Sequence, residues 1–137
     1  MSPHSPSILL VEDDPNDVTL FTRALRKVLP DSLLSVARDG DEAVEFLSKV
    51  RTAAVQEAGT APTVVILDLK LPKRSGLEVL EWIQGRRELH RHRLVVLSSS
   101  EEPKDLERAF RAGLEEYHVK PPNFTELVEV LRKILKP

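Results

Sequence analysis

Acidic, hydroxyl and amino side chains follow the short apolar runs of this sequence. Glu12-Asp13-Asp14 comes after the run 8–11, Asp68 after 64–67, Ser98-Ser99-Ser100 after 94–97 and Lys120-Pro121 after 117–119. Carboxylates that gather in one place repel each other unless a cation lies between them. All-oxygen ligands suit Mg²⁺, with Mn²⁺ as an alternative, better than metals that prefer nitrogen or sulfur. This pattern predicts a divalent cation site.

The charges of this set indicate the chemistry. Glu12, Asp13 and Asp68 are three anions, which a divalent cation and the ammonium of Lys120 would balance. A carboxylate in such a place can attack phosphorus, because the metal and the ammonium stabilise charge on the oxygens of the transferred group. Asp68 is the candidate nucleophile, since it interrupts the apolar run 64–71, where an unpaired carboxylate would be costly. The expected product is an aspartyl phosphate.

Single members of this set have simpler explanations. Asp14 or Asp17 alone is most often a helix cap or a solvated turn residue, and we interpret both in that way. Lys120 alone is compatible with an exposed surface lysine, and Ser98 alone is uninformative. The specific feature is that these residue types occur together, each directly after an apolar run.

The apolar runs themselves predict the elements that position these residues. The runs 8–11, 33–37, 64–67, 94–97 and 117–119 are short and continuous rather than alternating, as in strands that are covered on both faces. Between them, apolar residues recur at helical spacing, namely Val18, Phe21, Leu25 and Val28; Val44, Leu47 and Val50; Leu77, Leu80 and Ile83; Leu106, Ala109 and Phe110; and Leu127, Val130, Leu131 and Ile134. Five repeats of strand then helix predict a parallel α/β sheet with helices on both faces. In such sheets ligands bind beyond the carboxyl ends of the strands, where the polar residues lie.

Three helix starts carry capping signals. Ser75 with Glu78, Asn123 with Glu126, and Ser99 with Glu102 fit the capping box, in which a side-chain oxygen accepts from a free amide and the acid reaches back. The stretch 51–62 is predicted to prolong the second helix and then to form a loop, with Gly59 able to end the helix and Pro62 preventing its continuation.

Length and composition limit the classes of protein. The 137 residues suffice for one core, so we expect a single domain over 7–137 after a flexible N-terminus of residues 1–6. The net charge of −2 gives no general attraction to nucleic acid or anionic lipid. The basic run 86–93 has no aromatic residue to stack on a base and is interpreted as a solvated loop. Without cysteine, signal peptide or membrane-spanning run, the expected location is the cytoplasm.

Four segments closely resemble the receiver domains of two-component response regulators. They are Ile-Leu-Leu-Val-Glu-Asp-Asp-Pro at 8–15, Leu-Asp-Leu-Lys-Leu-Pro at 67–72, Val-Leu-Ser at 96–98 and Val-Lys-Pro at 119–121. The intervals also agree, with 30 residues from Asp68 to Ser98 and 22 from Ser98 to Lys120. The resemblance covers essentially the whole chain. It implies a doubly wound, flavodoxin-like (βα)5 fold with strand order 2-1-3-4-5.

The resemblance also implies the metal site. Asp68 would be the phosphoacceptor, and Glu12, Asp13 and Asp68 would bind Mg²⁺ together with the backbone carbonyl of Lys70. Family members often carry a neutral or smaller residue where Lys70 stands. If its ammonium reaches the site, it would shield the phosphoryl group or compete with Mg²⁺, and so change the lifetime of the phosphate.

Further roles concern the response to phosphorylation. Ser98 would be the switch hydroxyl that moves inward to the phosphoryl oxygen, Lys120 the ion-pair partner of the phosphoryl group, and Tyr117 the aromatic switch residue. The peptide bond before Pro121 is expected to be cis. The output would leave through the fourth helix, the fifth strand and the fifth helix, with a homodimer through this face as the preferred form.

Partners follow from the same resemblance. The expected phosphoryl donor is a histidine kinase or a phosphotransfer protein. The segment Leu-Asp-Leu-Lys-Leu-Pro-Lys-Arg, the paired prolines Pro121-Pro122, the extra residues 51–62 and the lack of an output domain resemble the single-domain regulators of phytochrome-type kinases. The alternative is an enzyme, a phosphatase or phosphotransferase with an aspartate nucleophile. Such enzymes usually need an acid two residues after the nucleophile, and here that residue is Lys70.

Overall fold

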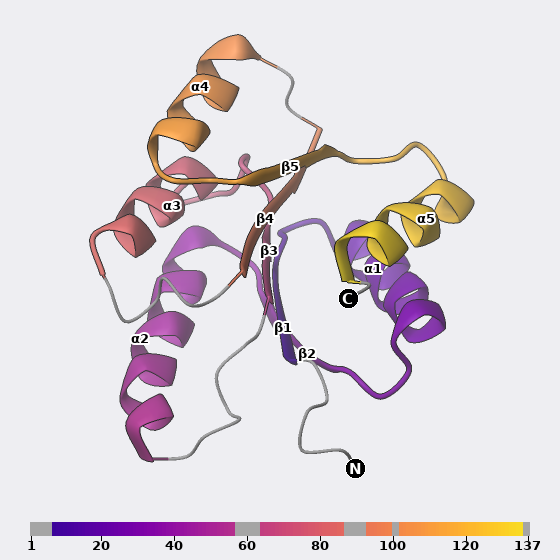
Figure 1. Ribbon diagram of the computed structural model, residues 1–137, viewed down its shortest axis with the longest axis horizontal. Helices are drawn as coiled ribbons and strands as arrows, with labels where there is room; N and C mark the ends of the chain where they lie inside the picture. Colours follow the sequence, from indigo (N-terminus) through magenta and orange to yellow (C-terminus); the bar gives the residue numbers. More distant parts are fainter. Residues whose placement is uncertain (1–6, 57–63, 87–92, 100–101, 136–137) are drawn as a thin grey trace.

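The computed structural model describes residues 7–56, 64–86, 93–99 and 102–135. Strands and helices alternate along this chain (Figure 1). The elements are β1 (Ser7–Val11), α1 (Pro15–Val28), β2 (Leu33–Ala37), α2 (Gly40–Gln56), β3 (Val64–Leu67), α3 (Gly76–Gln84), β4 (Arg93–Ser98), α4 (Pro103–Arg111), β5 (Glu116–Val119) and α5 (Phe124–Leu135). Each predicted strand and helix is present within a few residues of its expected bounds.

The strands form one parallel sheet in the order β2-β1-β3-β4-β5, as predicted. In the central pair, Val11 lies beside Leu67, and in the outer pair Ser98 lies beside Val119. Helices α1 and α5 cover one face of the sheet, and α2, α3 and α4 cover the other (Figure 1). Because all strands run in the same direction, the residues that follow them meet at one edge.

Two hydrophobic cores lie on opposite faces of the sheet. Successive strand residues point to opposite faces, so Leu9 and Val11 belong to the core under α2, α3 and α4. Ile8 and Leu10 belong to the core under α1 and α5. The middle strand β3 is buried over its whole length. The continuous apolar runs are therefore explained by burial on both faces.

The outer elements are less buried than the sequence predicted. Residues of the edge strands β2 and β5 are mostly half-buried or exposed, because each edge strand has a neighbour on one side alone. On α4, Ala109 is buried, whereas its neighbour Phe110 is 52% exposed. The helical pattern of apolar residues is therefore present, but it does not imply that each of its members is buried.

The predicted caps have three different outcomes. Ser75 and Glu78 form the full capping box of α3, with both side-chain hydrogen bonds present. At α5, the amide of Glu126 donates to the side chain of Asn123. The cap of α4 is Glu102, and it makes no side-chain capping bond. The Ser99–Glu102 box is thus wrong, since α4 begins with Pro103, whose fixed φ suits the first helical turn without a side-chain cap.

The predicted extension of α2 is confirmed up to Gln56. The loop expected beyond it, with Gly59 and Pro62, lies outside the described residues, as do the N-terminal residues 1–6 expected to be flexible and most of the basic run 86–93. Within the described ranges, no helix is long and apolar enough to cross a bilayer.

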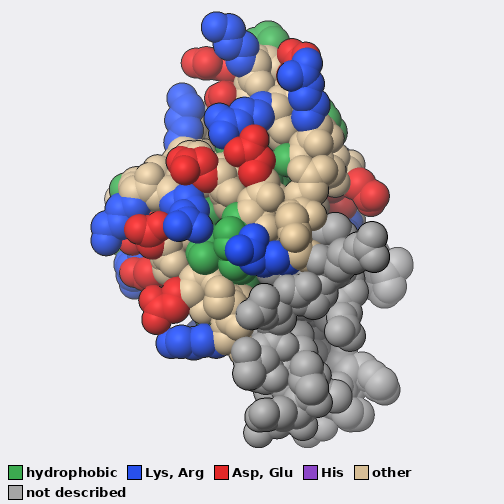
Figure 2. Space-filling view, turned by 90° about the vertical axis from the view of Figure 1, so that its left-hand side faces the viewer, with side chains coloured by type: hydrophobic (Ala, Val, Ile, Leu, Met, Phe, Trp, Pro, Cys, Tyr) green, Lys and Arg blue, Asp and Glu red, His purple; other side chains and the backbone are tan. Residues whose placement is uncertain are grey.

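Charges of both signs are interspersed on the face formed by α2, α3 and α4 (Figure 2). Several of them pair across elements, for example Arg108 of α4 with Glu81 of α3 at 2.7 Å. The pKa of Glu81 is lowered by its hydrogen bond from Arg108. Over the described residues this face is therefore mixed in charge and does not carry one dominant sign.

Candidate functional site

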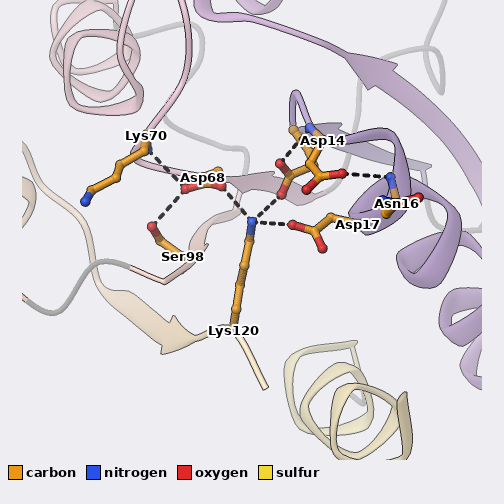
Figure 3. Close-up of polar contacts among 8 residues, drawn as sticks. Asp14, Asn16, Asp17, Asp68, Lys70, Ser98 and Lys120 are labelled. Atoms are coloured by element: carbon orange, nitrogen blue, oxygen red, sulfur yellow. Dashed lines mark hydrogen bonds and ion pairs between the residues drawn. The ribbon is translucent and has the colours of Figure 1, made fainter. Parts of the chain in front are cut away.

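The polar residues that follow four strands meet at one edge of the sheet (Figure 3). Glu12 follows β1, Asp68 follows β3, Ser98 ends β4 and Lys120 follows β5. Backbone bonds hold these ends in register, from the amide of Asp68 to the carbonyl of Val11 and from the amide of Lys120 to the carbonyl of Ser98. Sheet pairing alone therefore brings these side chains together.

Asp68 lies at the centre of the contacts and is 5% exposed. Its Oδ1 accepts from the Ser98 hydroxyl at 2.8 Å and from the Lys70 amide at 3.1 Å. Its Oδ2 accepts from the Lys120 ammonium at 2.8 Å. A buried carboxylate needs such donors, because an uncompensated buried charge is strongly destabilising.

Lys120 contacts three carboxylates. Its Nζ lies 2.6 Å from Glu12 Oε1, 2.9 Å from Asp17 Oδ2 and 2.8 Å from Asp68 Oδ2. Burial by itself would lower the pKa of this ammonium, but the hydrogen bonds to the three carboxylates outweigh burial and raise the pKa. Lys120 is therefore a fixed positive charge in the site.

Three carboxylates could also hold a cation together. Glu12, Asp13 and Asp68 each offer one oxygen, and these oxygens lie within 4.8 Å of one another. Burial raises the pKa of Glu12, while hydrogen bonds from Lys120 and the Asp14 amide partly oppose this effect. The donor set consists of oxygen alone and has more negative charge than Lys120 can balance. It therefore fits a hard divalent cation.

Comparison with known families decides what this arrangement is. The family description "Response regulator receiver domain" matches residues 8–132. The chain belongs to this family.

Two similar proteins come from different organisms. This receiver domain is 34% identical over 129 residues to the probable methanogenesis regulatory protein FilR2 of Methanothrix harundinacea, covering 93% of this chain and 79% of that protein. It is 33% identical over 127 residues to response regulator Rcp1 of Synechocystis sp., with 93% and 84% coverage.

Solved structures agree with this fold. The phosphorylated cyanobacterial phytochrome response regulator RcpA is 30% identical, with a TM-score of 0.83 over 95% of this chain and 91% of that chain. The bacteriophytochrome response regulator AtBRR is 41% identical, with a TM-score of 0.74 and 95% and 92% coverage. The predicted resemblance to regulators of phytochrome-type systems is confirmed at this level.

The backbone amide and the side-chain ammonium of Lys70 lie in different surroundings in the receiver domain. Its amide donates to the phosphoacceptor candidate Asp68, while its side chain is exposed. The ammonium points away from Asp68 and from Lys120 (Figure 3). This geometry argues against direct shielding of the site by the ammonium.

The Ser98 hydroxyl lies inward in this structure. It donates to Asp68, and the residue is 0% exposed. The expected move of this hydroxyl to a phosphoryl oxygen stays a prediction. Tyr117 lies half-buried on β5 and packs against the core under α2, α3 and α4.

The bond between Lys120 and Pro121 is trans, since no peptide bond of the described chain is cis. The prediction of a cis bond at Pro121 is wrong. The trans form is favoured by about 0.5–1 kcal/mol even before proline. With this bond trans, Lys120 reaches all three of its carboxylates, so the ion pairs give no reason for the less stable isomer.

Asp17 is the residue that sequence reasoning missed. It lies in the first turn of α1, where an acid is explained by the positive end of the helix dipole. In the structure it is an ion-pair partner of Lys120 at 2.9 Å. The sequence shows an acid shortly after Glu12-Asp13-Asp14, but this position does not identify Lys120 as its partner.

Proposed function

We propose that this response regulator receiver domain accepts a phosphoryl group on Asp68 in a Mg²⁺-dependent reaction, and that the donor is a histidine kinase or a phosphotransfer protein. One observation carries the proposal. Asp68 is a buried carboxylate placed between an ammonium and a hydroxyl, beside two further carboxylates that suit a divalent cation.

The reaction can be written in terms of the residues present. An oxygen of Asp68 forms a bond to phosphorus, and the bond from phosphorus to the donor atom breaks. With a phosphohistidine donor protonated on its second nitrogen, the electron pair of the P–N bond stays on the ring and a neutral imidazole leaves. Lys120 stabilises negative charge on the phosphoryl oxygens, and Ser98 and the Lys70 amide are hydrogen-bond donors beside Asp68.

A divalent cation would be held by Glu12, Asp13 and Asp68, with the carbonyl of Lys70 as a further candidate ligand. When bound, it supplies charge stabilisation for the transferred group. The Mn²⁺-bound form of Rcp1, 32% identical with a TM-score of 0.79, supports a metal in this family. Mg²⁺ is the physiological choice that we propose, because its preference for carboxylate oxygens and water fits a site with an exposed Asp13.

The input that we propose is a phytochrome-type histidine kinase. The support is the similarity to RcpA, a cyanobacterial phytochrome response regulator, and to AtBRR, a bacteriophytochrome response regulator. The match to FilR2, of comparable identity, comes from a methanogen regulator. Phosphotransfer profiling against the histidine kinases of the source organism would identify the donor, and preference for a kinase without a phytochrome sensor would refute this part.

The output surface that we propose consists of α4, β5 and α5. Exposed apolar side chains support it, namely Phe110 of α4 at 52% and Val119 of β5 at 45% exposure. Ser98 connects this surface to the site, since its hydroxyl would change its acceptor from Asp68 to a phosphoryl oxygen while Tyr117 repacks beside β4. A phosphate-dependent homodimer through this surface is the preferred form.

Labelling with acetyl phosphate tests the central step. The parent should gain one phosphoryl group in the presence of Mg²⁺, as measured by intact-protein mass spectrometry, and Asp68→Asn should gain none. Asp31→Asn is the matched control, because Asp31 is an exposed aspartate after α1 rather than at the strand ends. Unchanged labelling of Asp68→Asn, or full labelling of the parent with excess chelator, would refute the roles assigned to Asp68 and the metal.

The enzyme alternative has a separate test. A phosphatase would release phosphate from a phosphomonoester over many turnovers, whereas a signalling switch would be labelled once and decay. Sustained turnover that disappears in Asp68→Asn would favour the enzyme.

A further inference from the structure

The ammonium of Lys120 has no N–H left for an incoming phosphoryl group. It has three N–H bonds, and three carboxylates lie within 2.6–2.9 Å of its nitrogen. Under the function proposed above, this ammonium has to contact a phosphoryl oxygen. One carboxylate must therefore give up its hydrogen bond when the phosphoryl group arrives.

The three partners differ in how easily they can lose this bond. The side chains of Glu12 and Asp68 are 5% and 6% exposed, whereas that of Asp17 is 39% exposed. Before the bond to phosphorus forms, Glu12 and Asp68 are buried carboxylates whose charge Lys120 helps to compensate, whereas the more exposed Asp17 can exchange Lys120 for water. Asp17 also lies in the first turn of α1, where the helix dipole favours its negative charge without Lys120.

Asp17 is also distinct from the other partners in its place in the fold. Glu12 and Asp68 belong to the metal cluster at the ends of β1 and β3, but Asp17 approaches from helix α1. Figure 3 shows the Lys120 ammonium between Asp68 on one side and Asp17 on the other. A pull from Asp17 is thus directed away from the atom that would be phosphorylated.

We propose that Asp17 is a positioning residue that restrains the Lys120 ammonium in the resting site and releases it to the incoming phosphoryl group. The restraint slows phosphorylation in two ways. It occupies the N–H that the phosphoryl oxygen needs, and its negative charge repels an anionic donor. This proposal rests on phosphorylation of Asp68 and assigns Asp17 no contact with the metal.

The test compares Asp17→Asn with Asp14→Asn. Both changes remove one negative charge from the start of α1, but Asp14 caps the helix by accepting from the Asn16 amide, and asparagine keeps that cap. The side chain of Asp14 does not pair with Lys120 among the ion pairs of the described chain. The measured quantity is the second-order rate constant of labelling by acetyl phosphate with saturating Mg²⁺, at about 0.1 M and about 1 M salt, where the Debye length falls from about 10 Å to about 3 Å.

The expected result is that Asp17→Asn speeds labelling by about 2- to 5-fold, the size expected of a half-exposed ion pair. Most of this effect should persist at high salt, because the contact is direct. Asp17→Glu, which retains the charge and can still reach Lys120, should return the rate to that of the parent. Asp14→Asn should have a smaller effect that high salt removes. Thermal melts should show that all variants are folded at the assay temperature.

Two results would overturn the proposal while leaving the phosphorylation of Asp68 intact. One is a labelling rate of Asp17→Asn equal to that of the parent, and the other is an equal change in Asp14→Asn and Asp17→Asn that salt abolishes. A parent that is not labelled, or an Asp68→Asn variant that is labelled normally, would instead refute the proposed function and the restraint with it.

Discussion

Gly76 offers a sharp test of how the loop after Asp68 is built. A Cβ added at Gly76 would lie 2.2 Å from the carbonyl oxygen of Asp68 and 2.6 Å from the Cα of Leu69. Both contacts are with the backbone, so no side-chain rotation can relieve them. The first is more than about 1 Å shorter than an ordinary van der Waals separation of about 3.5 Å. Gly76→Ala must therefore displace either the start of α3 or the backbone of the phosphoacceptor candidate.

The expected loss of stability is about 2–3 kcal/mol, within the range for overpacking in a tightly packed region. For a chain of this size, about 4 °C of melting temperature corresponds to each kcal/mol. Gly76→Ala should therefore melt about 8–12 °C below the parent. Displacing Asp68 should also weaken Mn²⁺ binding by about 10-fold, since a shift near 1 Å disturbs a constellation of ligands.

Gly85→Ala is the matched control at the other end of the same helix. Its added Cβ would lie 3.7 Å from the carbonyl oxygen of Trp82, an ordinary van der Waals contact, and its φ is −74°. This change should leave Mn²⁺ affinity unaltered and should stabilise the fold slightly, by about 0.4–1 kcal/mol. Melting followed by circular dichroism and Mn²⁺ titration by calorimetry would measure both quantities. Equal melting temperatures of the two variants would refute the close approach of Gly76 to Asp68.

Three further predictions follow from the site. Burial raises the pKa of Glu12 above its ordinary value of 4.5, so Glu12→Gln should stabilise the metal-free protein. This gain should be absent well below pH 4.5 and should grow as the pH rises through the raised pKa, because the unfolded carboxyl ionises first; a gain that is largest in acid would contradict the reasoning. Lys70→Asn should change the unfolding free energy by less than about 0.5 kcal/mol and leave the aspartyl-phosphate lifetime within a factor of about 2, equivalent to about 0.4 kcal/mol; a larger change in decay would mean that the ammonium reaches the site. Ser98→Ala should still be labelled but should lose most of the phosphate-dependent association measured by light scattering, and an association equal to that of the parent would rule out Ser98 as the link to α4, β5 and α5.

Periodicity predicted most of the fold because burial on both sheet faces leaves a direct trace in the sequence. The run Val64–Leu67 is uniformly apolar and becomes the fully buried β3. The same reasoning did not predict the exposure of residues in the outer elements of the fold. Phe110 has the spacing of an inward residue but is exposed on α4, because helical spacing identifies one side of a helix without saying how far the sheet extends beneath it.

The site likewise contains residues that the sequence could place and residues that it could not. Residues at the ends of strands, such as Asp68 and Ser98, could be placed because parallel pairing fixes where strands end. Asp17 could not, since its contact with Lys120 spans 103 residues and depends on how α1 is oriented against the sheet. The isomer of the peptide bond before Pro121 could not be predicted either, because the energy difference between the cis and trans forms is small. Local sequence does not determine which form is present.

The distance along the chain between Asp68 and Lys120 has a consequence for synthesis. Lys120 lies 52 residues after Asp68, which corresponds to roughly 3–10 s at about 5–20 residues per second on the ribosome. During this interval β1 and β3 can already be present, while Glu12, Asp13 and Asp68 have no ammonium to neutralise them. The nascent edge must therefore take cations or protons from the solvent until β5 is added. Lys120 follows β5 and pairs with Glu12 after β1 and with Asp68 after β3, so competence to receive a phosphoryl group arises only when the last strand has joined the sheet.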